Sequence, residues 1–206
     1  MLSPAKESAR WVAEDEGFRP PRFDAPLDVS AFLARVPDGA VGKGMFLRRL
    51  FSELASRGHP QPTDETFQPF QDVPLSRCLE LNVTAAQILY PGLPTPEALR
   101  RLAWLSFETF QDSLAGQLTL FSTQHNPHAI FSLTSTVVRL TTNVGSYRHR
   151  YIDSRSCMIS ARDTYFFAEC FGVGMAEGVL RFCGRPGSVW VRTFSQADVD
   201  YLIRWT

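Results

Sequence analysis

The spacing of apolar residues changes once along this chain, and this change constrains the fold more than any other feature. As far as Gly145, apolar side chains recur at every third or fourth position, which is the spacing of amphipathic helices. Beyond Gly145 they largely alternate with polar side chains, as in strands with one buried face. The sequence therefore predicts an α+β fold, in which a helical N-terminal part packs on a C-terminal four-stranded antiparallel sheet.

The C-terminal unit, residues 146–206, is predicted to have the order β-β-α-β-β. Aromatic residues and histidine alternate with arginines before a turn at Asp153–Ser154, and a second alternating run follows it, which predicts a hairpin. Helical spacing returns over 165–183. Two further alternating runs, 189–193 and 199–205, are predicted to be the last two strands.

The helical part, residues 28–142, has its strongest apolar stripe in a long helix predicted between residues 96 and 121. Thr95-Pro96-Glu97 supplies a hydroxyl cap, a proline at the first helical position and an acid in the first turn. Further helices are expected from Asp28, from Met45, over 75–90 and over 128–142. The stripe of the long helix is expected to be the spine of the core: Leu99, Ala103, Phe107, Phe110, Leu114, Leu118 and Phe121.

Length and composition favour one domain with an ordinary core. The chain has 206 residues, of which 44% are apolar. Residues 1–27 are charged and proline-bearing, and we expect an N-terminal arm, flexible or docked, with Trp11 and Phe18 as anchors. Residues 28–206 are expected to form a single α+β domain.

Charge and cysteine content exclude several classes of protein. Lys+Arg and Asp+Glu are balanced at 21 each, so no global basic excess indicates a nucleic-acid partner. No apolar run is long enough to span a membrane, and the first residues lack the apolar segment of a secretory signal, so a cytoplasmic protein is expected. The four cysteines form no CxxC pattern and are expected to be reduced, mostly buried and not bound to metal.

Several segments resemble a paralogous family of myxobacterial proteins that form a domain of unknown function. They are Gly44-Met45-Phe46, the PEALRRLAWLSFETFQDSLAGQ run, the FGVGMAEGVLRFCG run and the closing ADVDYLIRW. The resemblance covers about residues 25–206 and implies no particular activity.

The C-terminal layout is also similar to a wider fold group, which holds haem-nitric-oxide sensors, vinyl-reductase-type sensor domains and vesicle-tethering subunits. In the haem sensors a Tyr-x-Ser-x-Arg motif holds the haem propionates. Here Tyr151, Ser154 and Arg155 have a different spacing. Haem is therefore not carried over, and no cofactor is expected.

The predicted helix over 165–183 contains Gly172, Gly174 and Gly178, each of which costs about 1 kcal/mol relative to alanine in a helix. Either the helix approaches its neighbour so closely that a Cβ would collide, or the glycines leave room for a flat ligand. Glu169 and Glu177 lie in the same segment and are expected to be exposed; a buried carboxylate there would need a partner, for which Arg150 and Arg162 are candidates.

Other candidate sites have simpler interpretations. The arginines of the hairpin could hold an anion, but charges on a strand edge also prevent aggregation. His125 and His128 have no third ligand close in sequence, so we expect loop or capping histidines rather than a metal site. No GxSxG, P-loop or Rossmann motif is present, and no catalytic residue is assigned.

These observations favour a non-enzymatic regulatory or sensory domain that binds a small apolar molecule between the long helix and the sheet. One alternative is a protein-protein interaction or dimerisation module, with a regulatory partner or a second copy bound at the sheet edge or on helix 75–90. A second alternative is an enzyme whose site assembles only in three dimensions. The residues expected to bind the ligand are Phe107, Phe110, Phe171, Gly174, Gly178, Tyr201 and Arg150.

Overall fold

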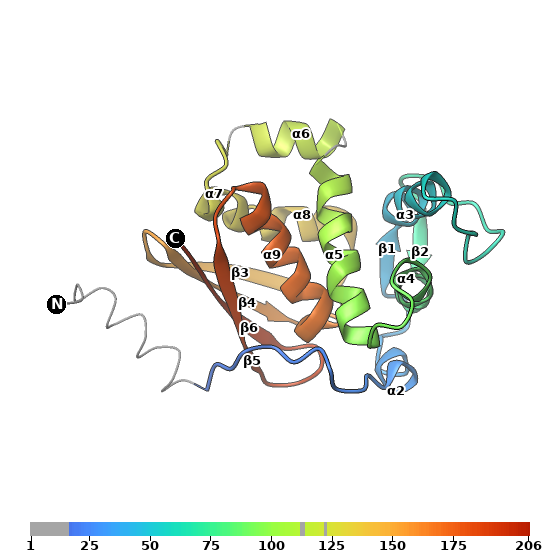
Figure 1. The fold of residues 1–206 in the computed structure, drawn as a ribbon, viewed down its shortest axis with the longest axis horizontal. Helices are drawn as coiled ribbons and strands as arrows, with labels where there is room; N and C mark the ends of the chain where they lie inside the picture. Colours follow the sequence, from blue (N-terminus) through green and yellow to red (C-terminus); the bar gives the residue numbers. More distant parts are fainter. Residues whose placement is uncertain (1–16, 112–113, 122) are drawn as a thin grey trace.

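Four antiparallel strands form one side of the molecule in the computed structural model, which describes residues 17–111, 114–121 and 123–206 (Figure 1). The strand order is β3-β4-β6-β5, so the first strand pairs with the second and the last strand lies between β4 and β5. This arrangement confirms the predicted β-β-α-β-β unit. The strands are β3 (Ser146–Asp153), β4 (Ser156–Arg162), β5 (Gly187–Thr193) and β6 (Val199–Trp205).

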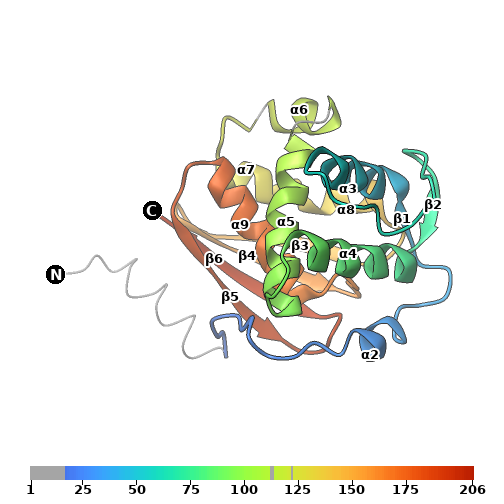
Figure 2. The ribbon, with the colours of Figure 1, turned by 45° about the vertical axis from the view of Figure 1, so that its right-hand side comes forward.

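Helices cover one face of this sheet in successive layers (Figures 1 and 2). Helix α9 lies on the sheet, α5 lies beside α9, and α3 and α4 lie on the far side of α5. A π-helical turn, η1 (Ala168–Gly172), leads into α9 (Val173–Phe182). The other helices are α2 (Val29–Leu33), α3 (Gly44–Ser56), α4 (Leu75–Leu89), α5 (Thr95–Gln111), α6 (Leu114–Phe121), α7 (Pro127–Ser132) and α8 (Thr134–Thr141).

The expected long helix is divided into α5 and α6, and this prediction was wrong in its extent. Helix α6 lies across the end of α5 in Figure 1. A Cβ at Gly116 would lie 1.8 Å from the carbonyl oxygen of Phe110, so α6 folds back closely on the last turn of α5. Phe121 is consequently 89% exposed instead of being part of the core.

The other predicted helices are present, and one small sheet was not predicted. Residues 128–142 are helical but form two short helices, α7 and α8. A two-stranded sheet of β1 (Val41–Lys43) and β2 (Asp72–Pro74) was not predicted, because strands of three residues have no measurable periodicity. No helix among the described residues is long and apolar enough to cross a membrane.

The described part of the N-terminal arm is docked along the sheet. The backbone N–H of Arg19 donates to Val191 O at 2.9 Å, and Val191 N–H donates to Arg19 O at 2.8 Å, which covers part of the β5 edge. Phe18 is buried beside Leu202, on the face of the sheet opposite to α9. Phe18 is therefore an anchor, as predicted, whereas Trp11 lies outside the described residues.

Two hydrophobic cores meet along α5. One core lies among α2, α3, α4 and the first turns of α5, with Leu54, Leu79 and Leu99 fully buried or nearly so. The other lies between α9 and the sheet and includes Val173 and Ile203. Because α5 contributes to both cores, its packing on α9 determines how the two halves of the molecule are joined.

Two glycines allow α9 to lie directly against α5. A Cβ at Gly174 would lie 2.3 Å from the carbonyl oxygen of Arg100, and one at Gly178 would lie 2.9 Å from the Cβ of Phe107. Real Cβ atoms do not approach backbone oxygen so closely. The close-packing interpretation of these glycines is therefore confirmed.

A polar cluster at the half-exposed side of the α5–α9 contact fixes its register. The guanidinium of Arg100 donates to both carboxylate oxygens of Glu177, at 2.7 and 2.9 Å, and Trp104 Nε1 donates to the same carboxylate at 2.8 Å. Bidentate guanidinium–carboxylate pairs are geometrically specific. The pair therefore favours one position of α9 along α5.

Substituting Gly174→Ala tests the close approach. In an open helix this change would stabilise the protein by up to about 1 kcal/mol. Here the added Cβ meets backbone that cannot rotate away, so we expect the free energy of unfolding to fall by about 2 kcal/mol, in the range of overpacked cores. Urea denaturation measures the difference, and a stabilising effect would show that the helices are not in contact at this position.

Asp200 is a buried carboxylate on the opposite face of β6 from Tyr201. Its side chain is 3% exposed and forms ion pairs with Arg162 at 2.8 Å and with Arg192 at 2.7 Å. Burial by itself would raise the pKa of Asp200, but hydrogen bonds from Arg192, Ser160 and Arg162 outweigh it, and the pKa is lowered. Asp200 is therefore expected to be ionised in the folded protein at neutral pH.

Replacing Asp200 by asparagine should lower the free energy of unfolding by roughly 2 kcal/mol at neutral pH, because two guanidinium groups lose their counter-charge. A carboxylate with a lowered pKa stabilises the fold above its unfolded pKa of about 3.9, and this contribution is lost as the pH falls through the folded pKa. The difference in the free energy of unfolding between wild type and Asp200→Asn should therefore become smaller below about pH 5. Denaturant titrations over this range measure it, with the exposed Asp64→Asn as control, and a difference that is independent of pH would contradict the assignment.

Candidate functional site

A cavity of about 260 Å³ lies where the two hydrophobic cores meet. Residues from β1, α3, α4, α5, α6, α7, α8, β3, β4, η1, α9 and β6 line it. Most of them are apolar, and they come from both cores: Leu47, Leu50 and Leu105 from one, and Ile130, Ile159 and Val179 from the other.

The structure brings four of the predicted site residues to this cavity. Phe107 and Phe110 of α5, Phe171 of η1 and Tyr201 of β6 all line it. Phe107 is buried, and its ring lies 6.5 Å from that of Phe110. The cavity thus lies between α5 and the sheet, where a pocket was predicted, and the binding role of these residues stays a prediction.

The other three predicted residues do not line the cavity. Gly174 and Gly178 are packed against α5, which leaves no space for a ligand at either position. Arg150 is exposed, and its Nη2 contacts Met158 Sδ at 3.6 Å. The alternation of β3 explains this: Arg150 lies between His149 and Tyr151, and its side chain therefore points to the other face of the sheet.

Glu169 does not pair with the hairpin arginines either. Its carboxylate accepts two hydrogen bonds from Arg19, at 2.8 and 3.0 Å, and one from Thr193 Oγ1 at 2.6 Å. The side chain of Glu169 is partly exposed, and neither Arg150 nor Arg162, the candidates for a buried carboxylate, is among these partners, because the arginine comes from the N-terminal arm. Glu169 therefore ties this arm to η1 and β5.

Three polar groups that line the cavity, the hydroxyls of Tyr201 and Tyr147 and the thiol of Cys78, already have partners. Tyr201 Oη donates to Ala168 O at 2.8 Å, and burial raises the pKa of Tyr201 well above its ordinary value. Burial also raises the pKa of Tyr147, which is hydrogen-bonded to Thr164, to about 12. The Cys78 thiol contacts Val73 O at 3.9 Å, and burial raises its pKa to about 11. All three groups are therefore neutral near pH 7.

Charged lining residues are confined to the side of the cavity formed by β1 and α3. Lys43 is ion-paired with Asp72, and Glu53 accepts from Arg57 Nε at 2.7 Å. Phe46, also on this side, is 39% exposed. The deeper wall is formed by aliphatic and aromatic side chains of α5, α9 and the sheet.

Helix α8 forms a wall of the cavity without being buried itself. No residue of α8 is buried, yet Val137, Val138 and Thr141 line the cavity. The sequence predicts helices from Met45 and over 128–142 but does not indicate that they line a cavity, because apolar spacing is the same for a cavity wall and for a packed core.

None of the four histidines lines the cavity. His125 and His128, which are close in sequence, contact different residues. His125 stacks on Phe182 with ring centroids 4.6 Å apart. His128 instead lies with His149 and Cys157, in the one group of three candidate metal ligands found among the described residues. Asn126, rather than a histidine, caps α7 by accepting from the backbone N–H of His128 at 2.9 Å.

Comparison with solved structures shows that this fold is H-NOX-like. The Fe(II) unliganded H-NOX protein from K. algicida has a TM-score of 0.62 and 11% identity, with 80% of this chain and 96% of that chain covered. The S. oneidensis H-NOX protein in the Fe(II)NO state has a TM-score of 0.59 and 11% identity, with coverage of 80% and 99%. An oxygen-binding H-NOX domain related to soluble guanylate cyclases has a TM-score of 0.51 and 13% identity, with coverage of 79% and 92%. Identities this low show the shared fold alone.

Sequence comparison places the chain in a family. No curated protein matches it. The family model described as "Protein of unknown function (DUF2378)" matches residues 36–206, which is most of the chain. The protein therefore belongs to the DUF2378 family.

Proposed function

We propose that this DUF2378 protein is a non-enzymatic sensory or regulatory domain that binds a small apolar molecule in the cavity between the two cores. The observation that carries the proposal is the cavity itself: about 260 Å³ of space lined mostly by apolar side chains. A ligand site is expected to be a concave, mostly apolar pocket with few polar groups. The H-NOX-like fold supports it, since the related structures are described as nitric-oxide-bound and oxygen-binding proteins.

The volume restricts the size of the ligand. An apolar cavity of roughly 150 Å³ in another protein binds benzene, and sites for drug-sized ligands occupy about 300–1,000 Å³. The present cavity, at about 260 Å³, lies between these values. A compact molecule with one or two rings, or a short alkyl chain, fits this range.

The lining residues do not fit haem. Haem iron is held by histidine, thiolate, methionine or tyrosinate. No histidine lines this cavity. Burial raises the pKa of Cys78, Tyr147 and Tyr201, so all three are protonated and none offers a thiolate or tyrosinate. Met175 lines the cavity, but no histidine lines it that could be the second ligand of a methionine–histidine pair. Among the described lining residues Lys43 is the one cation available to the two propionates, and it is already paired with Asp72. The proposed ligand is therefore a neutral apolar molecule rather than haem.

Binding of a ligand in the cavity would affect α8. Its apolar side chains Val137 and Val138 face the cavity and are only half buried. A ligand in contact with them would bury more apolar surface at about 25 cal/mol per Å² and would hold α8 more firmly against the rest of the protein. A partner that recognises α8 or β3 beside it would then distinguish the two states.

Thermal denaturation with indole as the probe tests ligand binding. A ligand at 100 times its Kd stabilises the folded state by about 2.7 kcal/mol, which corresponds to an increase in Tm of roughly 5–10 °C for a protein of this size. Ala176 lines the cavity, and Ala176→Leu fills part of it, so this variant should lose most of the increase. Ala55 is exposed on α3, and Ala55→Leu should retain it. Equal responses in the two variants would show that indole binds elsewhere.

Native mass spectrometry of protein purified from its own host separates the proposal from its alternative. A retained small molecule that Ala176→Leu loses would support a ligand domain. A homodimer or a complex with another protein, with no retained molecule and no response to indole or benzene, would favour the interaction module instead. The same spectrum reports the number of subunits.

A further inference from the structure

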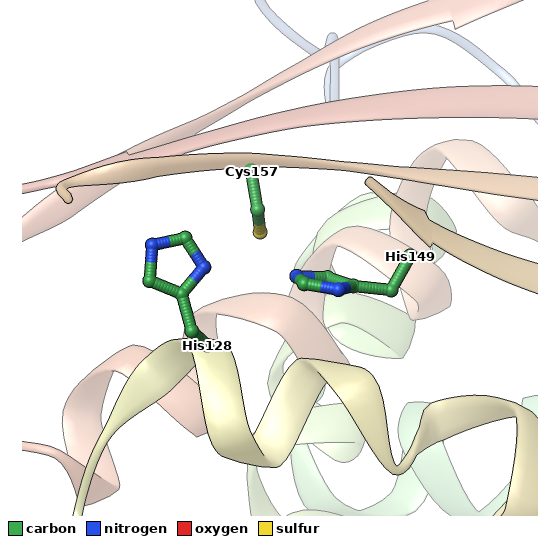
Figure 3. Close-up of side chains that lie close together, drawn as sticks. All are labelled: His128, His149 and Cys157. Atoms are coloured by element: carbon green, nitrogen blue, oxygen red, sulfur yellow. The ribbon is translucent and has the colours of Figure 1, made fainter. Parts of the chain in front are cut away.

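Three side chains from separate elements converge beside the cavity without lining it. They are His128 at the start of α7, His149 on β3 and Cys157 on β4 (Figure 3). The β3–β4 register pairs Tyr151 with Cys157, so His149 is the diagonal neighbour of Cys157 on the same face of the sheet. One ligand atom from each residue lies within 4.8 Å of the other two.

Two ring nitrogens in this group are buried and have no partner. His128 Nδ1 and His149 Nε2 are both without a hydrogen bond from any residue that the structure describes. In Figure 3 these two nitrogens point toward each other and toward the sulfur of Cys157. Buried polar atoms are nearly always satisfied, so an unsatisfied pair aimed at one point indicates a missing partner there.

The hydrogen bond on the other side of His128 prepares it to act as a ligand. His128 Nε2 lies 2.8 Å from the backbone oxygen of Asp153, which can only accept. The proton of a neutral ring is therefore on Nε2, and the lone pair is on Nδ1, facing the group. Metal-bound histidines commonly donate their second ring N–H to a backbone carbonyl in this way.

The surroundings keep His149 and Cys157 neutral and place aromatic rings against His128. Burial, and next the neighbouring His128 ring, lower the pKa of His149, so its ring is neutral at pH 7. Cys157 is fully buried, which raises the pKa of its thiol to about 12, and a metal would have to displace that proton. The ring of Trp205 lies 4.7 Å from that of His128, and the ring of Tyr151 lies 4.6 Å from it.

We propose that His128 Nδ1, His149 Nε2 and Cys157 Sγ bind one Zn²⁺ ion as a three-ligand site with a fourth position open. Nitrogen and sulfur donors suit Zn²⁺, whereas Mg²⁺ and Ca²⁺ require oxygen donors, and the group contains no carboxylate. Zn–N and Zn–S distances are about 2.0–2.3 Å, so donors that share one ion lie at most about 4.6 Å apart, and the three ligand atoms here lie within 4.8 Å of one another.

The site was not recognisable from sequence because its ligands lie 21 and 8 positions apart along the chain. It is independent of the ligand cavity, since none of the three residues lines that cavity. It is nevertheless adjacent to it: Ile130 and Ile159, each two positions from a proposed ligand, do line the cavity. Metal binding can therefore be tested separately from binding of an apolar molecule.

The test is a titration of untagged, chelator-treated full-length protein with Zn²⁺ in competition with a chromophoric chelator. We expect one Zn²⁺ per chain with a Kd below about 1 μM. His128→Gln, His149→Gln and Cys157→Ser should each weaken binding by about 100-fold or more, since changes outside the first coordination shell already cost 10–100-fold. The exposed His125→Gln and the buried Cys170→Ser are matched controls and should bind like the wild type.

Cobalt provides a readout that needs no variant. Co²⁺ bound at the proposed site should show a thiolate-to-cobalt charge-transfer band in the near ultraviolet, and Cys157→Ser should lose it while circular dichroism confirms that the variant is folded. Absence of binding, which would leave a water molecule as the partner of the two nitrogens, would overturn the proposal. So would bound Co²⁺ without the thiolate band in the wild type, or equal weakening in His125→Gln, which would indicate surface histidines.

Discussion

The contact between α5 and α9 joins the two halves of this molecule. Because Gly174 and Gly178 have no side chain, α9 lies against the backbone and the Cβ atoms of α5 rather than against the ends of its side chains. The carboxylate of Glu177 then meets Arg100 and Trp104 at hydrogen-bond distance. The N-terminal core and the sheet core are thereby held on opposite sides of one shared helix.

The cavity follows from this arrangement. Close packing at the glycines holds α5 against α9, which itself lies on the sheet. Phe107 and Phe110, in the second half of α5, line the cavity together with their neighbours. Helix α8 closes one side with half-buried apolar residues. The deeply buried hydroxyls are neutral and have partners of their own, as the Tyr201 hydroxyl does with Ala168 O. Water would find few hydrogen bonds there, which supports the proposal of an apolar ligand.

The positions of the predicted site residues followed from the sequence where they depended on the faces of long elements, while their binding role stays a prediction. Phe107 and Tyr201 lie on the inward faces of a regular helix and a regular strand, and both reach the cavity. Arg150 failed because a charged side chain on an alternating strand points away from the apolar face. Glu169 failed because its partner, Arg19, is 150 positions away in a segment whose docking has no periodic signal.

The sequence by itself determined the fold class and the β-β-α-β-β order of elements along the C-terminal unit, because periodicity acts over a few neighbouring positions, and it left two interpretations of the glycines that only the structure separated. Only the tertiary structure decided where the cavity lies, which residues of α3 and α8 complete it, and that His128 meets His149 and Cys157. These features depend on how separate elements are oriented toward one another. The orientation is set by packing across the whole chain, and apolar spacing is the same whether a helix faces a filled core or an empty space.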